Sequence, residues 1–449
     1  MNNKMQEEIE TYKRNHKKSL QLWERSQRIF PGGVSHNIRD FNMNYFDLGP
    51  PFIKKSQDSK LFDVDGNIYT DYWVTHGAAI LGHKNEQVIK AISSQLENGI
   101  HYGMVNEPAI ILGEKIIDAT PSIEELRFCT TGTEATMYAT RLARAYTNKS
   151  KIVKVRGGWH GGNDTLFYYV KDVEKGVESK GIQNQEEAGI LSFDYNDIRG
   201  FQKLIQENKD DIAAVIMEPV LGAGGAIPPI EGFLETVREE TEKHGIVLIY
   251  DEIITGFRLG YNSAQGYFGI TPDMTTLGKI VGGCTPIGVI GGKREILEQA
   301  NLKKSGDVWI GGGTFSANPI SMVAGSATLD VLKAGGKDIY ANLNNLGEKI
   351  RNKIDTILKE YNAPAFVTGV GSMICIHWFK DKIAPAQTST VIKLNVDKEK
   401  VSNFQLLMFN REMLIRSGFG YLCTKHTPKD IEKTLEAISE SIKIMIQNS

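Results

Sequence analysis

The stretch Gly245-Ile-Val-Leu-Ile-Tyr-Asp251 is apolar from Ile246 to Tyr250 and ends in a carboxylate. An unbroken apolar run of this length is typical of a strand that is buried on both faces, as in the parallel sheets of α/β proteins. The last residue of such a strand lies at the carboxyl edge of the sheet, where these proteins bind ligands. A carboxylate at that edge requires a positive partner, because burying an unpaired charge is costly. Asp251 is therefore a candidate site residue.

Lys279 follows further along the chain, inside Leu277-Gly-Lys-Ile-Val-Gly-Gly283. Glycine and apolar neighbours predict dry surroundings, in which the pKa of a lysine falls and its neutral amine becomes reactive. Pyridoxal phosphate requires both groups, because it forms a Schiff base with a lysine and needs an acid beside its ring nitrogen. A strand that ends in Asp-Glu and a Gly-Lys pair are each common. The hypothesis therefore needs further residues that contact the phosphate and the ring.

The composition excludes several classes of function. The 52 lysines and arginines balance 54 acidic residues, so no charge excess favours nucleic acid or an anionic membrane as a partner. The four cysteines are scattered without a CxxC pair, which fits a reducing compartment. The amino terminus is too polar and acidic for a signal peptide, and no apolar run approaches the roughly 20 residues that span a bilayer. We expect a cytoplasmic protein with no metal site.

The order of apolar and polar stretches predicts the α/β fold class. Residues 5–30 have the spacing of a surface helix that ends at Pro31-Gly-Gly33, and residues 60–72 predict a hairpin around Asp65-Gly66. From about 105 to 320, strand candidates alternate with helical stretches, as in a mostly parallel sheet that is covered by helices. These strand candidates are Arg127–Thr130, Lys151–Val155, Ala213–Val220, Ile246–Tyr250 and Pro286–Gly291.

Three segments make up the expected domain organisation. Residues 1–75 form an N-terminal segment of helix and hairpin that packs with the small domain. Residues 76–330 form the large ligand-binding domain, and residues 331–449 form a smaller α+β domain around a strand-rich stretch at Phe366–Phe379. The sequence shows no repeat and no low-complexity linker, so we expect tightly packed domains.

Residues 128–135, Phe-Cys-Thr-Thr-Gly-Thr-Glu-Ala, predict a phosphate site. They pass from a strand through Thr131-Gly-Thr133 into an apolar-periodic helix. Gly132 allows the backbone to approach an anion, and the N–H groups and dipole of the first helical turn favour negative charge there. The alternative interpretation is that the two threonines only cap the helix.

Two further stretches fit a flat cofactor. Gly157-Gly-Trp-His-Gly-Gly162 places Trp159 and His160 in a glycine frame, where the indole offers a large face for a pyridine ring. Glu218 ends another apolar strand at the carboxyl edge of the sheet. The alternatives are a core tryptophan in a tight turn and an ordinary strand end before Pro219, which cannot donate to a ladder.

Taken together, the motifs resemble those of the class III aminotransferases in type and order. The shared motifs are Thr131-Gly-Thr-Glu-Ala135, Trp159-His-Gly161, Glu218-Pro219, Asp251-Glu-Ile-Ile-Thr-Gly-Phe-Arg258, Leu277-Gly-Lys279 and Gly312-Gly-Thr-Phe-Ser-Ala-Asn-Pro319. Within this class, the glutamate-1-semialdehyde 2,1-aminomutase subgroup is the most similar, through Pro31–Arg39, Ile227–Leu234 and Tyr261–Asp273. The resemblance covers roughly residues 20 to 445 and implies the fold-type I architecture of pyridoxal-phosphate transferases, with a large domain and a smaller one.

The resemblance implies a role for each matching residue. Lys279 is expected to bond to the cofactor and act as the catalytic base, and Asp251 to pair with the pyridinium nitrogen. Ile253 and Trp159 are expected on the two faces of the ring. The remaining expected cofactor contacts are Thr131, Gly132, Thr133, His160, Glu218 and Thr314.

Two of the implied roles concern partners. Thr314 matches a threonine that reaches the phosphate of the neighbouring subunit, so the resemblance implies a homodimer with shared active sites. Arg39 matches an arginine that binds the carboxylate of a small substrate, for which its planar fork is suited.

The departures from the aminomutase pattern fall at substrate positions. His36 occupies the place of a serine, His76 that of a tryptophan, and Ala223 that of an asparagine near the cofactor. The stretch Leu414–Tyr421, which contains Arg416, replaces Pro-Ser-Gln-Phe-Glu. We therefore expect His36, His76 and Arg416 to line an altered substrate pocket beside a complete set of cofactor residues.

This contrast favours an aminotransferase that moves an amino group between an amino acid or amine and a keto acid or aldehyde. The alternative is glutamate-1-semialdehyde 2,1-aminomutase, which would move the amino group within one carbon skeleton. A racemase or decarboxylase of the same fold is less favoured. A non-enzymatic cofactor-binding regulator is disfavoured further, because the chain has no spare basic segment for DNA binding.

Overall fold

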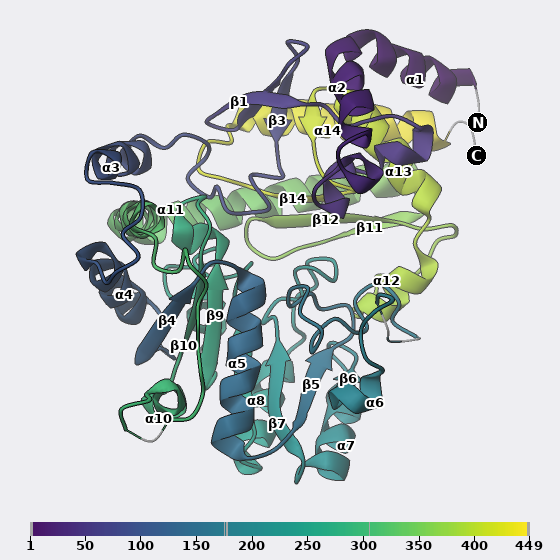
Figure 1. Cartoon of the computed structure of the whole chain (residues 1–449). Coiled ribbons are helices and arrows are strands. Elements are labelled where there is room, and N and C mark those ends of the chain that lie inside the picture. The colour runs from purple at the N-terminus through teal and green to yellow at the C-terminus, as the bar shows by residue number, and fades with distance from the viewer. Residues whose placement is uncertain (1–2, 175, 177, 305, 447–449) are drawn as a thin grey trace. The chain divides into compact units, whose positions relative to one another are not determined.

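The computed structural model describes residues 3–174, 176, 178–304 and 306–446. The expected domains also include residues 1, 2, 175, 177, 305 and 447–449, which lie outside this description. The chain forms two compact units. The first comprises Met1–Asn85, Leu343–Pro385 and Asn395–Ser449, and the second comprises Glu86–Asn342 and Ala386–Leu394. Figure 1 shows the elements of both units.

The second unit is built on a seven-stranded sheet with the order β4-β10-β9-β8-β7-β5-β6. All strands run parallel except β10, which is antiparallel to both of its neighbours. The prediction of a mostly parallel mixed sheet is confirmed. The strands are β4 (Glu125–Cys129), β5 (Lys151–Val155), β6 (Ile190–Phe193), β7 (Ile212–Met217), β8 (Val247–Asp251), β9 (Met274–Gly278) and β10 (Gly288–Gly292).

Some strand boundaries differ from those predicted. The strands β6 and β9 were not predicted, because Ile-Leu-Ser-Phe is short and Met-Thr-Thr-Leu-Gly carries two polar residues in a buried strand. The strand β7 ends at Met217 rather than Val220, since Pro219 cannot continue a ladder. Its residues are all buried, as the apolar run predicts.

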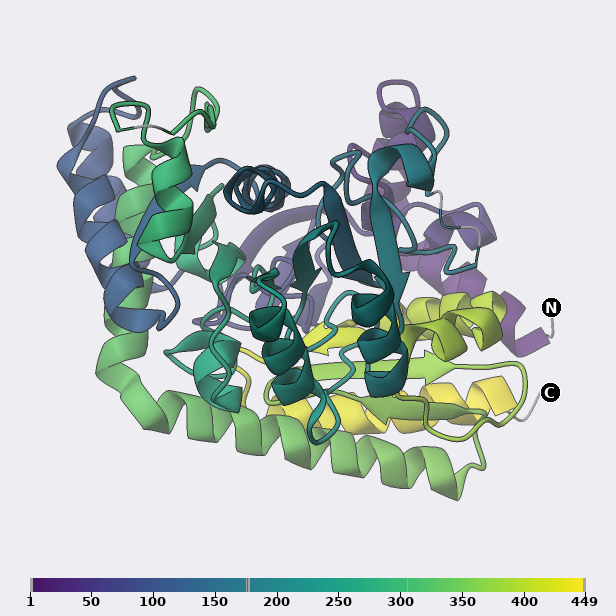
Figure 2. The same ribbon diagram turned by 90° about the horizontal axis from the view of Figure 1, so that it is seen from below.

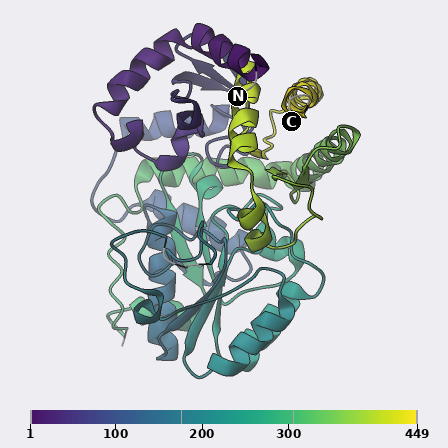
Figure 3. The ribbon, with the colours of Figure 1, turned by 90° about the vertical axis from the view of Figure 1, so that its right-hand side faces the viewer.

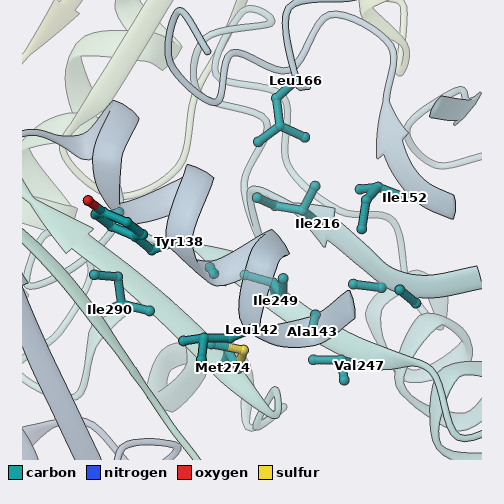
Figure 4. Close-up of a cluster of buried hydrophobic side chains, with 14 of the residues drawn as sticks. Tyr138, Leu142, Ala143, Ile152, Leu166, Ile216, Val247, Ile249, Met274 and Ile290 are labelled. Carbon is teal, nitrogen blue, oxygen red and sulfur yellow. The ribbon is translucent and has the colours of Figure 1, made fainter. Parts of the chain in front are cut away.

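Helices cover both faces of this sheet. The helix α5 (Gly132–Thr147) packs on one face, where Figure 2 shows it end-on, and α7 (Ile198–Asn208) and α8 (Phe233–Lys243) lie on the other face in Figure 3. Tyr138, Leu142 and Ala143 of α5 meet isoleucine and valine side chains of the strands in a fully buried cluster (Figure 4). The remaining helices of the unit are α3 (Glu86–Glu97), α4 (Glu107–Ala119), α6 (Gln185–Ala188), α9 (Ser263–Phe268), α10 (Arg294–Leu297), the 3-10 helices η4 (Lys279–Gly282) and η5 (Glu298–Ala300), most of α12 (Ser389–Asn395) and the first part of α11 (Pro319–Glu360).

The first unit contains two small sheets. One has the order β1-β2-β3-β13 and the other β11-β12-β14. The predicted hairpin is confirmed, since Lys60–Asp63 and Ile68–Asp71 pair antiparallel across Asp65-Gly66. The elements are α1 (Asn3–Asn15), α2 (Lys17–Gln27), η1 (Pro31–Gly33), η2 (Asn37–Asp40), η3 (Met43–Phe46), β1 (Ile53–Gln57), β2, β3, the rest of α11, β11 (Ala365–Thr368), β12 (Met373–Trp378), α13 (Lys398–Asn410), β13 (Met413–Leu414), β14 (Phe419–Tyr421) and α14 (Pro428–Ile446).

The N-terminal surface helix was predicted as one helix, and this was wrong. It is two helices that are interrupted at His16, whose φ of −124° is not helical. The imidazole of His16 is buried and contacts Tyr12 O at 2.8 Å and the Tyr69 hydroxyl at 2.5 Å, so a tertiary contact breaks the helix. None of the described helices combines the length and apolar character that crossing a bilayer requires.

Candidate active site

Three predicted site residues of the second unit lie where strands β7, β8 and β9 end. Asp251 is the last residue of β8, Glu218 follows β7 and Lys279 follows β9. These strands are adjacent and parallel, so their carboxyl ends form one edge of the sheet. The fold therefore brings a lysine and two carboxyl groups together.

The Asp251 carboxylate is buried, with 2% of the residue exposed, and is held at both oxygens. Its Oδ1 accepts hydrogen bonds from the Ile253 N–H at 3.1 Å and the Thr276 hydroxyl at 3.2 Å. Its Oδ2 lies 2.7 Å from His160 Nδ1. Burial lowers the pKa of His160, while its hydrogen bond to Asp251 opposes that shift. The carboxylate is thus fixed in orientation.

Lys279 has the properties expected of a reactive amine. Burial lowers the pKa of its ammonium, while Asp251 and Glu218 oppose the shift. Its φ is 52°, a left-handed conformation that a residue with a Cβ adopts only when its surroundings enforce it. Gly278 precedes Lys279 and is paired with Gly288 across β9 and β10.

Glu218 is a second buried carboxyl group beside Asp251. Burial, followed by the neighbouring Asp251, raises the pKa of Glu218 to about 8. The N–H groups of Gly222 and Ala223 donate to its carboxyl oxygens at 3.2 and 3.3 Å. The raised pKa of Glu218 favours its neutral form at neutral pH.

The predicted phosphate loop joins β4 to α5. Thr131 caps α5: its hydroxyl accepts from the Glu134 N–H at 3.2 Å, and the Glu134 carboxylate accepts from the Thr131 N–H at 2.9 Å. The alternative interpretation of Thr131 as a cap therefore describes its hydroxyl correctly. The first N–H groups of α5, at Gly132 and Thr133, have no intrahelical acceptor and suit an anion.

The glycine-framed loop packs against this helix start. A Cβ on Gly161 would lie 2.5 Å from Thr133 Oγ1, so only glycine permits the approach. Trp159 is 40% exposed, and its ring meets that of Phe167 edge-on at 5.4 Å. The alternative interpretation, that Trp159 is a core tryptophan, is therefore wrong.

The residues of this edge fit pyridoxal phosphate. A Cβ on Gly132 would lie 2.4 Å from Ile253 Cδ1, so the helix start, Ile253 and Asp251 form one continuous cradle. The His160 Nε2 is buried and has no partner among the described residues. The group supplies a lysine amine, a fixed carboxylate and a helix N-terminus, which are the three features that this cofactor requires.

The predicted substrate residues lie in the first unit, where three of them form a cluster. The rings of His36 and His76 meet edge-on at 5.7 Å, His76 lies 4.5 Å from Trp73, and the Arg416 guanidinium lies over the Trp73 ring at 5.5 Å. Arg39 is exposed in η2. Burial, followed by the charges of Arg39 and Arg416, lowers the pKa of His36. This cluster is a candidate anion-binding group.

A left-handed turn holds His76 in place. Val74, Thr75 and His76 have φ values of 36°, 59° and 57°. Such values are outliers for β-branched residues and concentrate at functional sites. The Asp71 carboxylate supports the turn by accepting from the N–H groups of Trp73 and Val74 at 2.8 and 3.0 Å.

Thr314 is exposed and lines a hollow of ≈ 1030 Å³ in the second unit. His101, Asn106 and Arg127 also line it. The strongly exposed apolar residues that line it include Met104 at 74% and Val105 at 94%. An exposed apolar surface of this kind is typical of a protein interface.

Sequence reasoning missed Thr276 and Lys154. Thr276 donates to Asp251, and Lys154 hydrogen-bonds the loop that carries Trp159 and His160. A lysine inside the apolar run Lys151–Val155 was a visible signal, since a buried charge requires partners. No cluster of three or more metal-binding side chains is found within the described residues.

Comparison with known proteins defines the class of this chain. The family model of the class III aminotransferases matches residues 46–415. The chain therefore belongs to the class III aminotransferase family. The predicted cofactor is confirmed with it: this is a family of pyridoxal-phosphate enzymes.

Individual relatives extend the similarity to nearly the whole chain. Glutamate-1-semialdehyde 2,1-aminomutase of Methanosarcina acetivorans is 42% identical over 437 residues, which cover 95% of this chain and 98% of that protein. Glutamate-1-semialdehyde 2,1-aminomutase 2 of Bacillus licheniformis is 39% identical over 432 residues, with 94% and 97% coverage. Among solved structures, an omega-transaminase from Sphaerobacter thermophilus aligns with a TM-score of 0.85 at 30% identity, over 94% of this chain and 96% of that one.

These findings confirm the family resemblance and the fold-type I architecture. The differences at the expected substrate positions led us to predict an aminotransferase. The names of these relatives instead favour the alternative, an aminomutase.

Proposed function

We propose that this chain is a pyridoxal-phosphate enzyme that moves an amino group within one small substrate, as a glutamate-1-semialdehyde 2,1-aminomutase. The observation that supports this most is the 42% identity over 95% of the chain to an enzyme of that name. Lys279, Asp251 and Glu218 lie at one edge of the sheet, an arrangement that suits both an aminomutase and an aminotransferase.

Each residue at the sheet edge has a proposed role. When bound, pyridoxal phosphate supplies an electron sink for the carbon that loses a proton. Lys279 would hold the cofactor through its amine and would move a proton at the substrate carbon. Asp251 holds a proton on the ring nitrogen, and His160 and Thr276 keep its carboxylate in place.

The remaining contacts orient the cofactor. The N–H groups at Gly132 and Thr133 bind the phosphate, together with Thr131. Ile253 and Trp159 would contact opposite faces of the ring. Glu218 lies beside Asp251, where its neutral form adds no second charge to the site.

We propose that two copies of the chain share their active sites. Thr314 would reach the phosphate of the partner subunit. The exposed Met104 and Val105, which line the same hollow as Thr314, would be buried in that interface. A cytoplasmic location stays a prediction.

Arg39 is proposed to bind the substrate carboxylate, with His36, His76 and Arg416 shaping the surrounding pocket. These three lie together in the first unit, at positions that depart from the aminomutase pattern. This cluster is the one observation that favours a second candidate, an aminotransferase that acts between two separate substrates.

One experiment decides between the two candidates. The cofactor-loaded protein is given glutamate-1-semialdehyde alone, and separately amino acids or amines paired with keto acids, and kcat/KM is measured for each reaction. We expect isomerisation to be at least tenfold faster than any transfer. Transfer that is tenfold faster than isomerisation would overturn the aminomutase proposal and establish the aminotransferase.

A further inference from the structure

Lys154 is a fully buried lysine in strand β5 of the seven-stranded sheet. It is the fourth residue of β5, and 0% of it is exposed. Burying an ammonium in such surroundings costs free energy unless every N–H finds an acceptor. The position of its acceptors therefore indicates what the residue does.

All three donors of the Lys154 ammonium have backbone acceptors. Its Nζ donates to Gly158 O at 3.0 Å, Leu166 O at 3.1 Å and Tyr168 O at 2.5 Å. The first carbonyl stands just before Trp159 and His160, and the other two stand at the far end of the same loop. Burial, followed by the charge of Lys393, lowers the pKa of Lys154 to about 7. One side chain thus contacts both ends of the loop.

The middle of the loop is held by the residues of the cofactor site. The Thr136 hydroxyl of α5 donates to His160 O at 2.6 Å, and His160 Nδ1 lies 2.7 Å from Asp251 Oδ2. The Gly157 N–H donates to Tyr169 O at 2.6 Å and closes the base of the loop. His160 thus lies between the two ends of the loop that Lys154 contacts.

We propose that Lys154 is a positioning residue: its ammonium fixes the backbone at Gly158 and at Leu166–Tyr168, so that His160 stays on Asp251 and Trp159 stays beside the cofactor ring. This inference rests on the proposed cofactor roles of Trp159 and His160. It assigns to Lys154 no contact with substrate.

The test compares Lys154→Met with a matched control on the same strand. Lys151→Met removes a lysine whose Nζ pairs with Asp211 at 2.9 Å near the surface, with no bond to the loop. Hydrogen exchange of the peptide 156–169 is measured by mass spectrometry in cofactor-free protein. We expect at least tenfold faster exchange in Lys154→Met and parent-like exchange in Lys151→Met.

Two further readouts separate positioning from general stability. The visible circular dichroism of the bound cofactor reports the asymmetry of its surroundings, and it should fall in Lys154→Met and remain in the control. Lys154→Arg keeps the charge and several donors, so it should recover part of both signals. Parent-like exchange in Lys154→Met would overturn the inference.

The remaining outcomes are also decisive. If Lys154→Met does not fold, the parent and Lys154→Arg are compared: complete exchange of peptide 156–169 in the parent at the shortest labelling time would overturn the inference, and slow exchange that is accelerated in Lys154→Arg would support it. If exchange is faster but the cofactor signal is unchanged, Lys154 orders the loop without positioning Trp159 and His160. That result would overturn the inference. The proposed function is tested separately, through Lys279.

Discussion

Replacing Asp251 by asparagine keeps the size of the side chain and removes its charge. The amide oxygen can still accept the hydrogen bonds that the Ile253 N–H and the Thr276 hydroxyl donate to Oδ1. The cofactor should therefore still bind. A neutral amide cannot hold the proton on the ring nitrogen, however. The loss of the charge contact should therefore lower kcat/KM rather than cofactor binding.

The size of the effect follows from the burial of the pair. Removing one partner of a buried ion pair costs about 3 to 5 kcal/mol. At 1.36 kcal/mol for each factor of ten, this is a loss of about 150- to 5000-fold in kcat/KM. Thr276→Val is the matched control, because it removes one hydrogen bond to the same carboxylate and leaves the charge. We expect it to lose about 1 kcal/mol, or about fivefold.

The assay measures kcat/KM of the parent and both variants at equal cofactor occupancy, which is determined from the cofactor released on denaturation. The expected order of activity is parent, Thr276→Val, then Asp251→Asn. Activity of Asp251→Asn within tenfold of the parent, with the cofactor bound, would refute the assignment of Asp251 to the ring nitrogen.

Four other variants test the site and the assembly. Lys279→Ala should lose the visible absorption band of the covalently bound cofactor and steady turnover; a retained band would exclude Lys279 as the bonding amine. Thr314→Ala should weaken cofactor binding by about 1.5 to 3 kcal/mol, the worth of a hydrogen bond to a charged group, and native mass spectrometry should find a dimer; a cofactor-loaded monomer at micromolar concentration would rule out the shared site. Arg39→Ala should weaken carboxylate substrates by about 1.5 to 3 kcal/mol and affect amines without a carboxylate far less; equal losses would contradict its role. Glu218 has a pKa of about 8 in the fold against 4.5 ordinarily, so the stability of its neutral form is present below pH 4.5 and lost as the pH rises to about 8. Glu218→Gln should therefore reduce the fall in the free energy of unfolding between pH 5 and 8, measured by urea denaturation of cofactor-free protein, and an unchanged fall would count against the shifted pKa.

The sequence predicted the parts of the fold whose signal is local. The run that ends at Asp251 is long and wholly apolar, and it forms the buried strand β8. The strand β9, which leads to Lys279, was missed because its two threonines are buried by the sheet around them, which no local pattern reveals. The antiparallel direction of β10 could not be predicted from its local sequence either, because the tertiary fold determines which strands pair.

The candidate site divides in the same way. The residues at strand ends were predictable, because the carboxyl ends of parallel strands lie at the same edge of the sheet. The cluster of His36, His76 and Arg416 joins residues that are far apart in the sequence, and only the fold shows that the two histidine rings touch. Thr276 gave no signal at all, because one threonine in a strand is ordinary.

The reversed strand β10 has a consequence for how the reactive amine can move. The chain leaves the sheet at Gly278 and returns at Gly288, directly opposite in the ladder, so the connection that begins with Lys279 is closed at its base like a hairpin loop. A base closed in this way restricts how far the main chain at Lys279 can move. Movement of the Lys279 amine would then come mainly from rotation about its own side-chain bonds. In its proposed role, a lysine tethered in this way would stay at a high effective concentration beside the reacting carbon.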